Sequence, residues 1–478
     1  MKRFYITTAL PYVNAEPHIG FALEIVQADI IARYHKLLGE EVIFNTGTDE
    51  HGLKVYLKAR EEGKDIQEYV DENAAKFVKL KEVLNLDFTN FIRTTEPHHI
   101  AAAQEFWRQC DKNGDIYKKN YRVKYCVGCE LEKTESELVD GKCPIHPNLE
   151  LEFIDEENYF FRFSKYQKPL LELYEKYPDF VVPAHRLTEI RNFVASGLQD
   201  FSVSRLKSKM PWGVPVPGDE SQIMYVWFDA LVNYVSTLGW PENEKNFGDF
   251  WGTKEKPNAL QIAGKDNLRQ QSAMWQAMLL SAGLPPSRRI IIHGFITSDG
   301  QKMSKSLGKV VNPYEIVEKY GTDALRFFLA HDISPFEDSD FSREKFKESY
   351  NANLANGIGN LAARVMKLAE DNLEKSVRPD TTELPSEYEE AMEKFEFNRA
   401  TVYILSRVRA VDQKINKKEP FRLVKTDPGT GKTLIVELAK ELYFIARLLE
   451  PFIPNTSAKI KEAVIANKKP ENLFPRLK

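Results

Sequence analysis

The sequence predicts an α/β fold in which a doubly wound, parallel (Rossmann-like) sheet is split by a cysteine-rich insertion and followed by an all-α helical bundle. Three observations lead to this prediction. A strand–helix–strand pattern fills residues 2–48, and the same pattern returns after residue 257. Between these two blocks, three of the four cysteines are clustered in residues 126–143. Beyond residue 335 the chain consists of long amphipathic segments.

The first block begins with "KRFYITTAL", whose β-branched and aromatic residues are typical of a buried strand. In the following stretch Leu23, Val26 and Ile30 recur at helical spacing, and Gly39 is a natural end for that helix. "EVIFNTGTD" then has the composition of a second buried strand. A βαβ unit of this kind predicts a parallel sheet.

The second block repeats the pattern with a strand in "NALQIAGKD", a helix in "NLRQQSAMWQAMLLSAG" and a strand in "RRIIIHGFI". We therefore expect one sheet that is built from two distant segments. The expected domains are residues 1–116 (first half of the sheet domain), 117–201 (insertion), 202–335 (second half) and 336–478 (helical domain).

Residues 342–372, 386–416 and 432–453 read as long helices of the C-terminal bundle, with a loop at 376–385. The stretch "PGTGKT" (428–433) is reminiscent of a phosphate-binding loop. That motif requires a glycine where this chain has Thr426, and the preceding segment is helical rather than a strand. We therefore expect 428–433 to be a loop between helices.

The composition is that of a globular protein, with 42% hydrophobic and 28% charged residues among 478. A net charge of -4 excludes a bulk polycation, although a local basic face would be enough to contact RNA. No apolar run reaches the ~20 residues that span a bilayer, so no membrane partner is expected. The N-terminal stretch reads as a strand rather than an export signal. The expected compartment is a reducing cytoplasm, where cysteines are metal ligands or free thiols.

Four residues in "CVGCELEKTESELVDGKCPIH" have the spacing of a metal knuckle, C-x2-C-x13-C-x2-H. They are Cys126, Cys129, Cys143 and His146. Three thiolates and one imidazole fill a tetrahedral Zn²⁺ shell without an open position, which predicts a structural site. Cys110 stands apart and is expected to be a small buried hydrophobic residue.

Two motifs predict a phosphate-binding crevice. In "PHIGF" a histidine and a glycine stand between a strand and a helix, where free amides and the helix dipole favour an anion. The lysines of "KMSKS", Lys302 and Lys305, follow another strand. Carboxyl ends of parallel strands converge on one crevice, so the lysines could close over a triphosphate that His18 also contacts. Asp266 ends a strand and is well placed for ribose hydroxyls.

These motifs together resemble a known family. "HIGF" and "KMSKS" are similar to the paired signatures of class I aminoacyl-tRNA synthetases, with a near match to "HIGH" and a full match to "KMSKS". "ALPYVN", "TGTDEHG", "YVWFDAL", the cysteine knuckle and "HGFITSDGQKMSKS" resemble methionyl-tRNA synthetases in particular. The resemblance runs from the first strand to the helical C-terminus.

The resemblance implies an enzyme, a methionine–tRNA ligase. Such an enzyme activates L-methionine with Mg²⁺-ATP to methionyl-adenylate and transfers it to the 3′-terminal adenosine of tRNA(Met), for translation initiation and elongation. The implied partners are ATP, L-methionine and tRNA(Met), and the implied ions are one structural Zn²⁺ and Mg²⁺. Because the chain ends at "LFPRLK" without the appended module of some relatives, we expect a monomer.

The resemblance also assigns site residues. Catalytic roles fall to His18, Lys302 and Lys305. ATP contacts fall to Gly20, Asp266, His293, Gly294 and Lys305. The methionine site is assigned to Asp49, which would hold the α-ammonium, and to the side-chain pocket Leu10, Tyr12, Trp227, Ala230, Tyr234 and Gln271.

Two positions depart from the family pattern. The last residue of the "HIGH" motif is Phe21, so one imidazole near the nucleotide is missing. Where relatives commonly carry Phe-His before a tryptophan, this chain has Gln270 and Gln271. A glutamine amide can donate a hydrogen bond to the methionine sulfur, so Gln271 is kept as a pocket residue.

The family reads the CAU anticodon with its helical domain. "GNLAAR" matches an Asn-Leu-x-x-Arg pattern that places Asn360 and Arg364 one helical turn apart. Phe421 takes the place of a stacking tryptophan, and an aromatic ring there can stack on a base. Two alternatives remain: a class I synthetase for cysteine, valine, leucine or isoleucine, and a non-catalytic RNA-binding paralogue.

Overall fold

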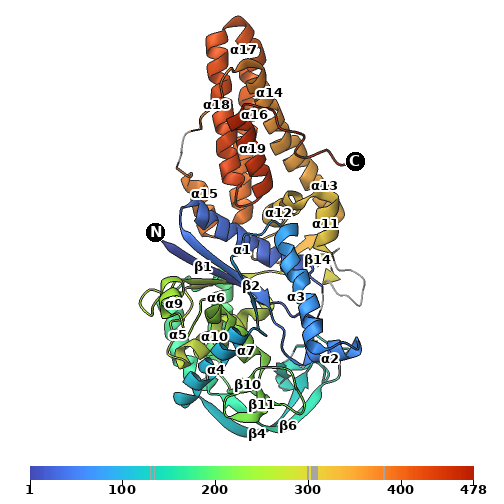
Figure 1. Ribbon diagram of the computed structural model, residues 1–478, viewed down its shortest axis with the longest axis vertical. Coiled ribbons are helices and arrows are strands. Elements are labelled where there is room, and N and C mark those ends of the chain that lie inside the picture. Colours follow the sequence, from blue (N-terminus) through green and yellow to red (C-terminus); the bar gives the residue numbers. More distant parts are fainter. Residues whose placement is uncertain (15, 130, 134, 299–300, 303–310, 380–382) are drawn as a thin grey trace.

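The computed structural model describes residues 1–14, 16–129, 131–133, 135–298, 301–302, 311–379 and 383–478. Its centre is a six-stranded sheet in the order β3-β2-β1-β12-β13-β7 (Figure 1). All neighbouring strands are parallel. The strands are β1 (Arg3–Thr8), β2 (Glu41–Thr48), β3 (Asn90–Arg93), β7 (Val181–Val182), β12 (Ala259–Gly264) and β13 (Arg289–His293). The predicted doubly wound fold is confirmed.

Side chains of β1 alternate between two hydrophobic cores, as a pleated strand buried on both faces requires. Phe4 and Ile6 belong to the core that contains α1 (Ile19–Leu37), while Tyr5 belongs to the opposite core. The first core also takes residues from α3 (Ile66–Val83), α11 (Pro313–Tyr320) and α12 (Thr322–His331). The second takes residues from α4 (Pro97–Lys112), α5 (Gln167–Lys176), α6 (Ala184–Ala195), α7 (Val226–Leu231), α8 (Asn233–Ser236), α9 (Glu244–Trp251) and α10 (Trp275–Ser281).

The expected insertion forms an antiparallel sheet, order β5-β4-β6-β8, at the end of the molecule away from the helical domain (Figure 1). Its strands are β4 (Ile116–Cys126), β5 (Leu131–Lys133), β6 (Glu152–Phe161) and β8 (Phe201–Ser202). A small sheet of β9 (Ser204–Leu206), β10 (Pro215–Val216) and β11 (Asp219–Met224) follows. One strand within the expected insertion, residues 117–201, belongs to the central sheet instead: β7 pairs with β13. A two-residue strand has too few side chains to show a period.

A third small sheet joins segments on either side of the "KMSKS" motif. It has the order β15 (Gln301–Lys302), β14 (Ile296–Ser298) and β16 (Ser339–Phe341). The strand β16 lies inside the range expected for the helical domain, so the helices proper begin after it.

The helical domain projects from one side of the sheet (Figure 1). Its helices are α13 (Arg343–Ser349), a π-helical segment (Tyr350–Gly359), α14 (Asn360–Asn372), α15 (Ser386–Glu393), α16 (Phe397–Lys418), α17 (Pro420–Thr426), α18 (Pro428–Leu449) and α19 (Pro454–Ala466). The expected loop at 428–433 is wrong. Those residues begin α18, because Asp427 accepts a hydrogen bond from the Thr430 amide and Pro428 starts the first turn. The predicted loop at 376–385 lies partly outside the described residues.

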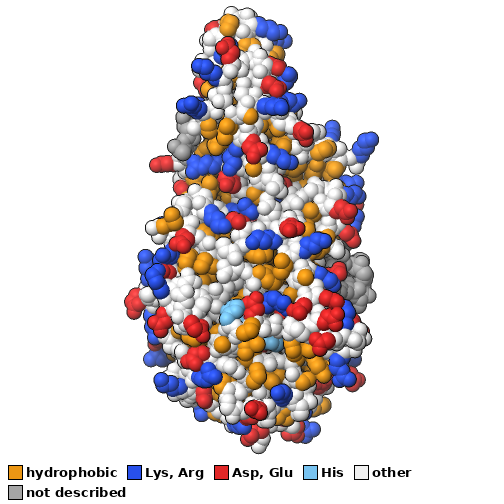
Figure 2. All heavy atoms as spheres, viewed as in Figure 1, with side chains coloured by type: hydrophobic (Ala, Val, Ile, Leu, Met, Phe, Trp, Pro, Cys, Tyr) orange, Lys and Arg blue, Asp and Glu red, His pale blue; other side chains and the backbone are white. Residues whose placement is uncertain are grey.

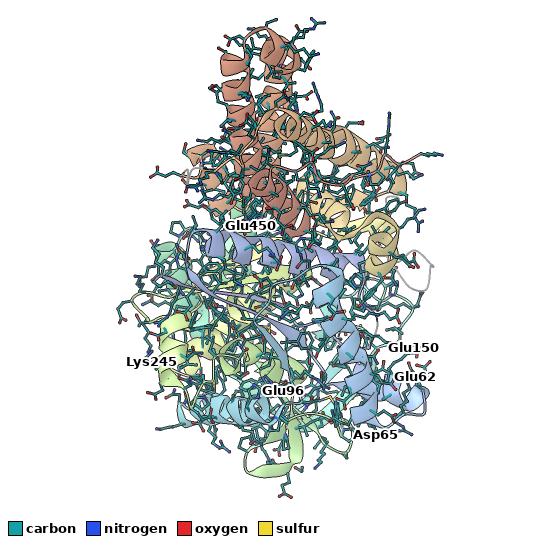
Figure 3. The ribbon with its side chains drawn as sticks, turned by 45° about the horizontal axis from the view of Figure 1, so that its top comes forward. Glu62, Asp65, Glu96, Glu150, Lys245 and Glu450 are labelled. Atoms are coloured by element: carbon teal, nitrogen blue, oxygen red, sulfur yellow. The ribbon has the colours of Figure 1, made fainter. Side chains whose placement is uncertain are left out.

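A fully buried arginine joins the two domains. The Arg326 guanidinium donates to the carbonyl oxygens of Leu84 (3.0 Å), Pro451 (2.9 Å) and Phe452 (2.9 Å) and pairs with Asp29 of α1 at 2.7 Å. Figure 3 shows the base of the helical domain, where Glu450 is labelled, lying against α1. Because the guanidinium spans the junction, the position of α1 depends on the helical domain.

The surface carries no dominant charge on the face seen in Figure 2, where acidic and basic side chains are mixed. This distribution agrees with the net charge of -4. Within the described ranges no helix is both long and apolar enough to cross a membrane.

Candidate active site

The candidate site lies where the order of the sheet reverses. From β1 the chain moves to β2 and β3 on one side, whereas β12 and β13 extend the sheet on the other side. In doubly wound sheets the loops at the carboxyl ends of the strands separate at such a point, and this is where ligands bind in such folds. Residues 9–12 follow β1 and residues 265–267 follow β12, so these two segments, which carry predicted site residues, lie at this edge of the sheet.

The turn that begins α1 holds His18. This residue is the N-cap, and its Nδ1 accepts a hydrogen bond from the Gly20 amide at 3.1 Å. In the neutral ring the proton is then on Nε2, which makes that atom a donor. A Cβ atom at residue 20 would lie 2.9 Å from His18 Cε1. Gly20 therefore leaves room for the imidazole itself.

The chain on the far side of the "KMSKS" motif returns to this turn. The Ile19 amide, next to His18, donates to the carbonyl oxygen of Val311 at 3.0 Å. Lys302 belongs to β15 and pairs with Thr297 of β14. The side chain of Lys302 and all of Lys305 lie outside the described residues. The two ends that flank 303–310 are nevertheless placed, and one of them contacts the first residue of α1.

A buried ion pair joins β13 to α1. His293, at the end of β13, contacts Glu24 of α1 through Nε2 at 3.0 Å and the Gly294 carbonyl through Nδ1 at 2.7 Å. Glu24 also accepts from the Ala9 amide at 2.8 Å. Burial lowers the pKa of His293, but the hydrogen bond and charge of Glu24 outweigh this and raise it. For the Glu24 carboxyl, burial has the opposite effect and raises the pKa.

His293 is 5% exposed, so the predicted ATP ligand lies beneath the surface of the site. Asp266 is exposed on the turn after β12, and its Oδ1 would lie 2.7 Å from a Cβ at Gly264. Gly294 faces the backbone of residues 337–338, since a Cβ there would be 2.2 Å from the Glu337 carbonyl carbon. Sequence reasoning missed Glu24, although an acidic residue on the apolar face of a predicted helix was an available signal.

The residues predicted to bind methionine come from the segments that follow β1 and β2, from α7 and α8, and from a π-helical turn (Gln270–Met274). Tyr12 forms a backbone bridge with Asp49 at the end of β2, and the Asp49 amide donates to the Pro11 carbonyl at 2.9 Å. Trp227 of α7 meets Tyr12 edge to face, with ring centroids 6.5 Å apart. Ala230 is buried one turn after Trp227, and Leu10 is partly buried just before Tyr12.

Tyr234 and Gln271 form the inner end of this group. Gln271 Nε2 donates to Tyr234 Oη at 2.6 Å, and Gln271 Oε1 accepts from Gln261 Nε2 at 3.3 Å. Both residues are 2% exposed. The amide that we expected to donate to a sulfur atom is therefore engaged with the tyrosine hydroxyl.

A second buried network was not predicted. Asp229 of α7 contacts His51 Nδ1 at 3.1 Å and lies 3.7 Å from His99 Nε2 of α4. Burial raises the pKa of Asp229, but the two imidazoles outweigh this and lower it. The network attaches α7, which carries Trp227, to α4 and to the end of β2. His51 and Asp229 are 178 residues apart in the sequence, so no local sequence pattern could predict their contact.

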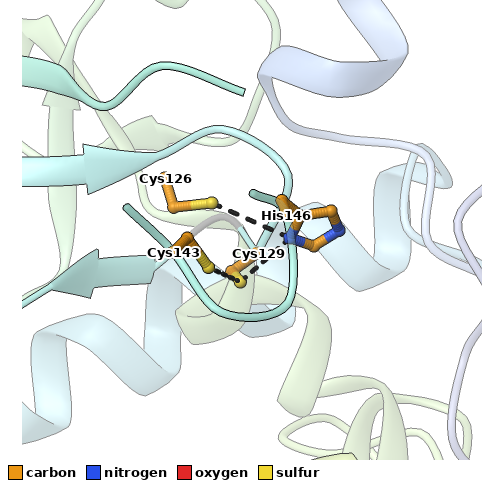
Figure 4. Close-up of side chains that lie close together, drawn as sticks. All are labelled: Cys126, Cys129, Cys143 and His146. Atoms are coloured by element: carbon orange, nitrogen blue, oxygen red, sulfur yellow. Dashed lines mark hydrogen bonds between the residues drawn. The ribbon is translucent and has the colours of Figure 1, made fainter. Parts of the chain in front are cut away.

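The predicted metal ligands come together at the end of the β4–β5 hairpin (Figure 4). The ligand atoms of Cys126, Cys129, Cys143 and His146 all lie within 4.8 Å of one another. The Cys129 and Cys143 sulfurs are 3.4 Å apart, and Cys129 Sγ lies 3.3 Å from His146 Nδ1. Such separations suit a tetrahedron around an ion with bonds of about 2.0–2.3 Å. These four residues could hold a metal, and their donor set fits Zn²⁺.

The residues predicted to read bases lie on the helical domain. Arg364 and Phe421 line a shallow groove of about 350 Å³ between α14, α16 and α17. Arg364 is paired with Asp412 and donates to Asn416 Oδ1 at 2.9 Å. Phe421 is 44% exposed, and Asn360 is exposed at the start of α14.

Family models match along nearly the whole chain. Residues 4–151 and 148–366 match the model of class I tRNA synthetases (M). The doubly wound sheet, the His18 turn and this match define a class I aminoacyl-tRNA synthetase. Residues 367–475 match the anticodon-binding domain of methionyl-tRNA ligase. The chain belongs to the methionyl-tRNA synthetase family.

Relatives agree with this placement. Methionine–tRNA ligases of Nostoc sp. (42% identical, 96% of this chain and 89% of the relative) and Brucella suis (39%, 98% and 93%) are similar throughout. The methionyl-tRNA synthetase of Mycobacterium tuberculosis in complex with methionyl-adenylate matches with a TM-score of 0.89 at 33% identity, over 100% of this chain and 99% of that chain. Its free form matches with a TM-score of 0.83 at 31% identity, with the same coverage.

Proposed function

We propose that the protein activates L-methionine with ATP to methionyl-adenylate and transfers the methionyl group to the 3′-terminal adenosine of tRNA(Met), for translation initiation and elongation. The observation that carries this proposal is the 3.0 Å contact between Ile19 and Val311. Val311, which follows the "KMSKS" motif in the chain, thereby contacts the first residue of α1, next to His18.

In the first step the methionine carboxylate attacks the α-phosphorus, an oxygen–phosphorus bond forms, and pyrophosphate leaves. Charge stabilisation dominates such a step. We assign it to His18, Lys302 and Lys305, with Mg²⁺ accompanying the ATP phosphates. Asp266 binds the ribose. Gly20 and Gly294 are assigned to the ATP site, where they leave room for the His18 ring and for the backbone at Glu337 respectively. His293 is assigned a supporting place behind them, through its buried pair with Glu24.

For the amino acid, Asp49 faces the α-ammonium, and a thioether packs against Leu10, Tyr12, Trp227, Ala230 and Tyr234. Sulfur beside aromatic rings is favourable by about 0.3–1.5 kcal/mol. Gln271 orients the tyrosine hydroxyl. A structural Zn²⁺ on the cysteine knuckle would hold the hairpin in its folded shape.

Anticodon bases are proposed to bind at the groove on the helical domain, with Phe421 stacking and Asn360 and Arg364 donating hydrogen bonds. Replacing Phe421 by alanine should raise the KM for tRNA(Met) and leave amino-acid activation unchanged. We further propose that the protein is cytoplasmic and that it is a monomer. Sedimentation equilibrium of the purified protein would test the monomeric state.

The deciding experiment is amino-acid-dependent exchange of pyrophosphate into ATP, with all twenty amino acids and homocysteine. Exchange driven chiefly by methionine supports the proposal. Exchange with another amino acid retains the class I chemistry but overturns the pocket, and no exchange from folded protein favours a binding paralogue. Lys305→Ala should lower exchange steeply and leave tRNA binding nearly unchanged.

A further inference from the structure

One lysine connects the cysteine knuckle with the proposed methionine pocket. Lys54 lies in the first turn of α2 (Leu53–Glu61), directly after the "GTDEHG" segment. Its Nζ donates to the carbonyl oxygen of Gly128 at 2.6 Å. The same Nζ lies 5.3 Å from the centroid of the Tyr12 ring. A single ammonium group thus contacts two segments that are far apart in the sequence.

The two groups that Lys54 contacts, the Gly128 carbonyl and the Tyr12 ring, belong to the knuckle and to the proposed methionine pocket. Gly128 stands inside the C-x2-C turn, and a Cβ there would be 2.5 Å from His146 Cγ. The carbonyl that holds Lys54 is therefore placed by the same packing that places the predicted metal ligand. Tyr12, at the other end, bridges Asp49 and meets the edge of Trp227.

We propose that Lys54 is a positioning residue that couples metal occupancy of the knuckle to methionine binding. The inference rests on the proposed function, because it requires methionine to bind beside Tyr12. With the metal bound, the Cys126–Cys129 turn presents the Gly128 carbonyl and holds the ammonium over the Tyr12 ring. Without the metal the turn relaxes, so the ammonium loses the Gly128 carbonyl and is no longer held over the Tyr12 ring. Methionine then meets a less ordered pocket wall.

Linkage makes the proposal quantitative. If metal strengthens methionine binding by some factor, methionine strengthens metal binding by the same factor. Removal of the coupling residue should lower methionine affinity and also abolish its dependence on the metal. A merely structural lysine would lower affinity or stability without changing that dependence.

The test measures methionine Kd by calorimetry on full-length protein, zinc-loaded and after chelation. The variants are Lys54→Met, Lys54→Arg and, as a matched control, Lys58→Met. Lys58 lies one turn along the same helix and pairs with Glu61 at 2.8 Å. Circular dichroism and zinc content establish that each variant is folded and loaded before binding is measured.

For the native sequence and Lys58→Met, chelation should raise Kd by roughly fivefold or more. Lys54→Met with zinc should show a similar rise, and chelation should then add less than about twofold. Lys54→Arg, which keeps a cation and a donor, should restore most of the metal dependence. The inference is overturned if Lys54→Met binds like the native protein, or if chelation raises Kd equally in both. If the zinc-loaded native protein binds no methionine, the proposed function fails, and the inference with it.

Discussion

The Gln271 side-chain amide lies 2.6 Å from the hydroxyl oxygen of Tyr234, and both side chains are buried. Because the amide donates, the tyrosine hydroxyl proton must be directed elsewhere. The tyrosine hydroxyl is thus left as a donor at the inner end of the proposed methionine pocket. Gln271 acts on the substrate through Tyr234 in this arrangement.

Gln271→Leu should raise the KM for methionine about tenfold, since an unpaired buried polar group costs about 1–3 kcal/mol. Tyr234→Phe should have an effect of similar size. Because the two groups act as a pair, the double variant should be little worse than either single variant. Initial rates of pyrophosphate exchange provide the measurement, and additive effects would contradict the pairing.

The Glu24–His293 pair predicts a dependence of stability on pH. The pKa of His293 is raised in the folded protein, so its stabilising contribution is complete below about pH 6.5, the usual value for histidine. It is lost as the pH rises through the folded-state pKa. The melting temperature should therefore fall between pH 6.5 and 9 more in the native protein than in His293→Gln. His185→Gln, at an exposed histidine, should follow the native curve.

Arg326→Met should destabilise the protein by about 3–5 kcal/mol, because buried Asp29 would keep only one of its two arginine partners, Arg33 at 2.7 Å. The variant also leaves three carbonyl oxygens without their donor. Urea unfolding would measure the loss. Arg343→Met is the control, since Arg343 and its partner Glu315 are 61% and 66% exposed and should contribute little. Equal midpoints for the two variants would show that the junction is not held by this charge.

Cys143→Ser should abolish stoichiometric zinc, because a structural site needs all four ligands. Elemental analysis of the purified protein measures the metal directly. Cys110→Ser should keep its zinc, since burial raises the pKa of the Cys110 thiol to about 12 and its sulfur lies against the Met278 carbonyl. Zinc loss from both variants alike would mean that the metal is held elsewhere.

Much of the fold followed from local patterns. Buried strands around Tyr5 and Phe44 and the helix between them have composition and spacing that adjacent residues determine. The strand β7 was missed because two residues show no period, and the start of α18 was missed because Asp427 caps a stretch that resembles a loop.

In the candidate site, too, residues with a local sequence pattern could be predicted, whereas their partners on other elements could not. The group of three cysteines and one histidine could be predicted as a possible metal site because the pairs C-x2-C and C-x2-H each bring two side chains together locally. His18 could be predicted as a candidate because the helix start that follows it can be recognised in the sequence. The partners of Gln271, His293 and Asp229 were not found, since each lies on another element.

By itself the sequence determined the two strand–helix–strand blocks, the helical C-terminal region, the spacing of the cysteine knuckle and the family, because these depend on residues near one another in the chain. The tertiary structure decided that Glu24 meets His293 across 269 residues and that Lys54 reaches both Tyr12 and Gly128. The physical reason is that a buried polar group takes its partner from whichever element packs against it. That choice is made only when the layers of the fold come together.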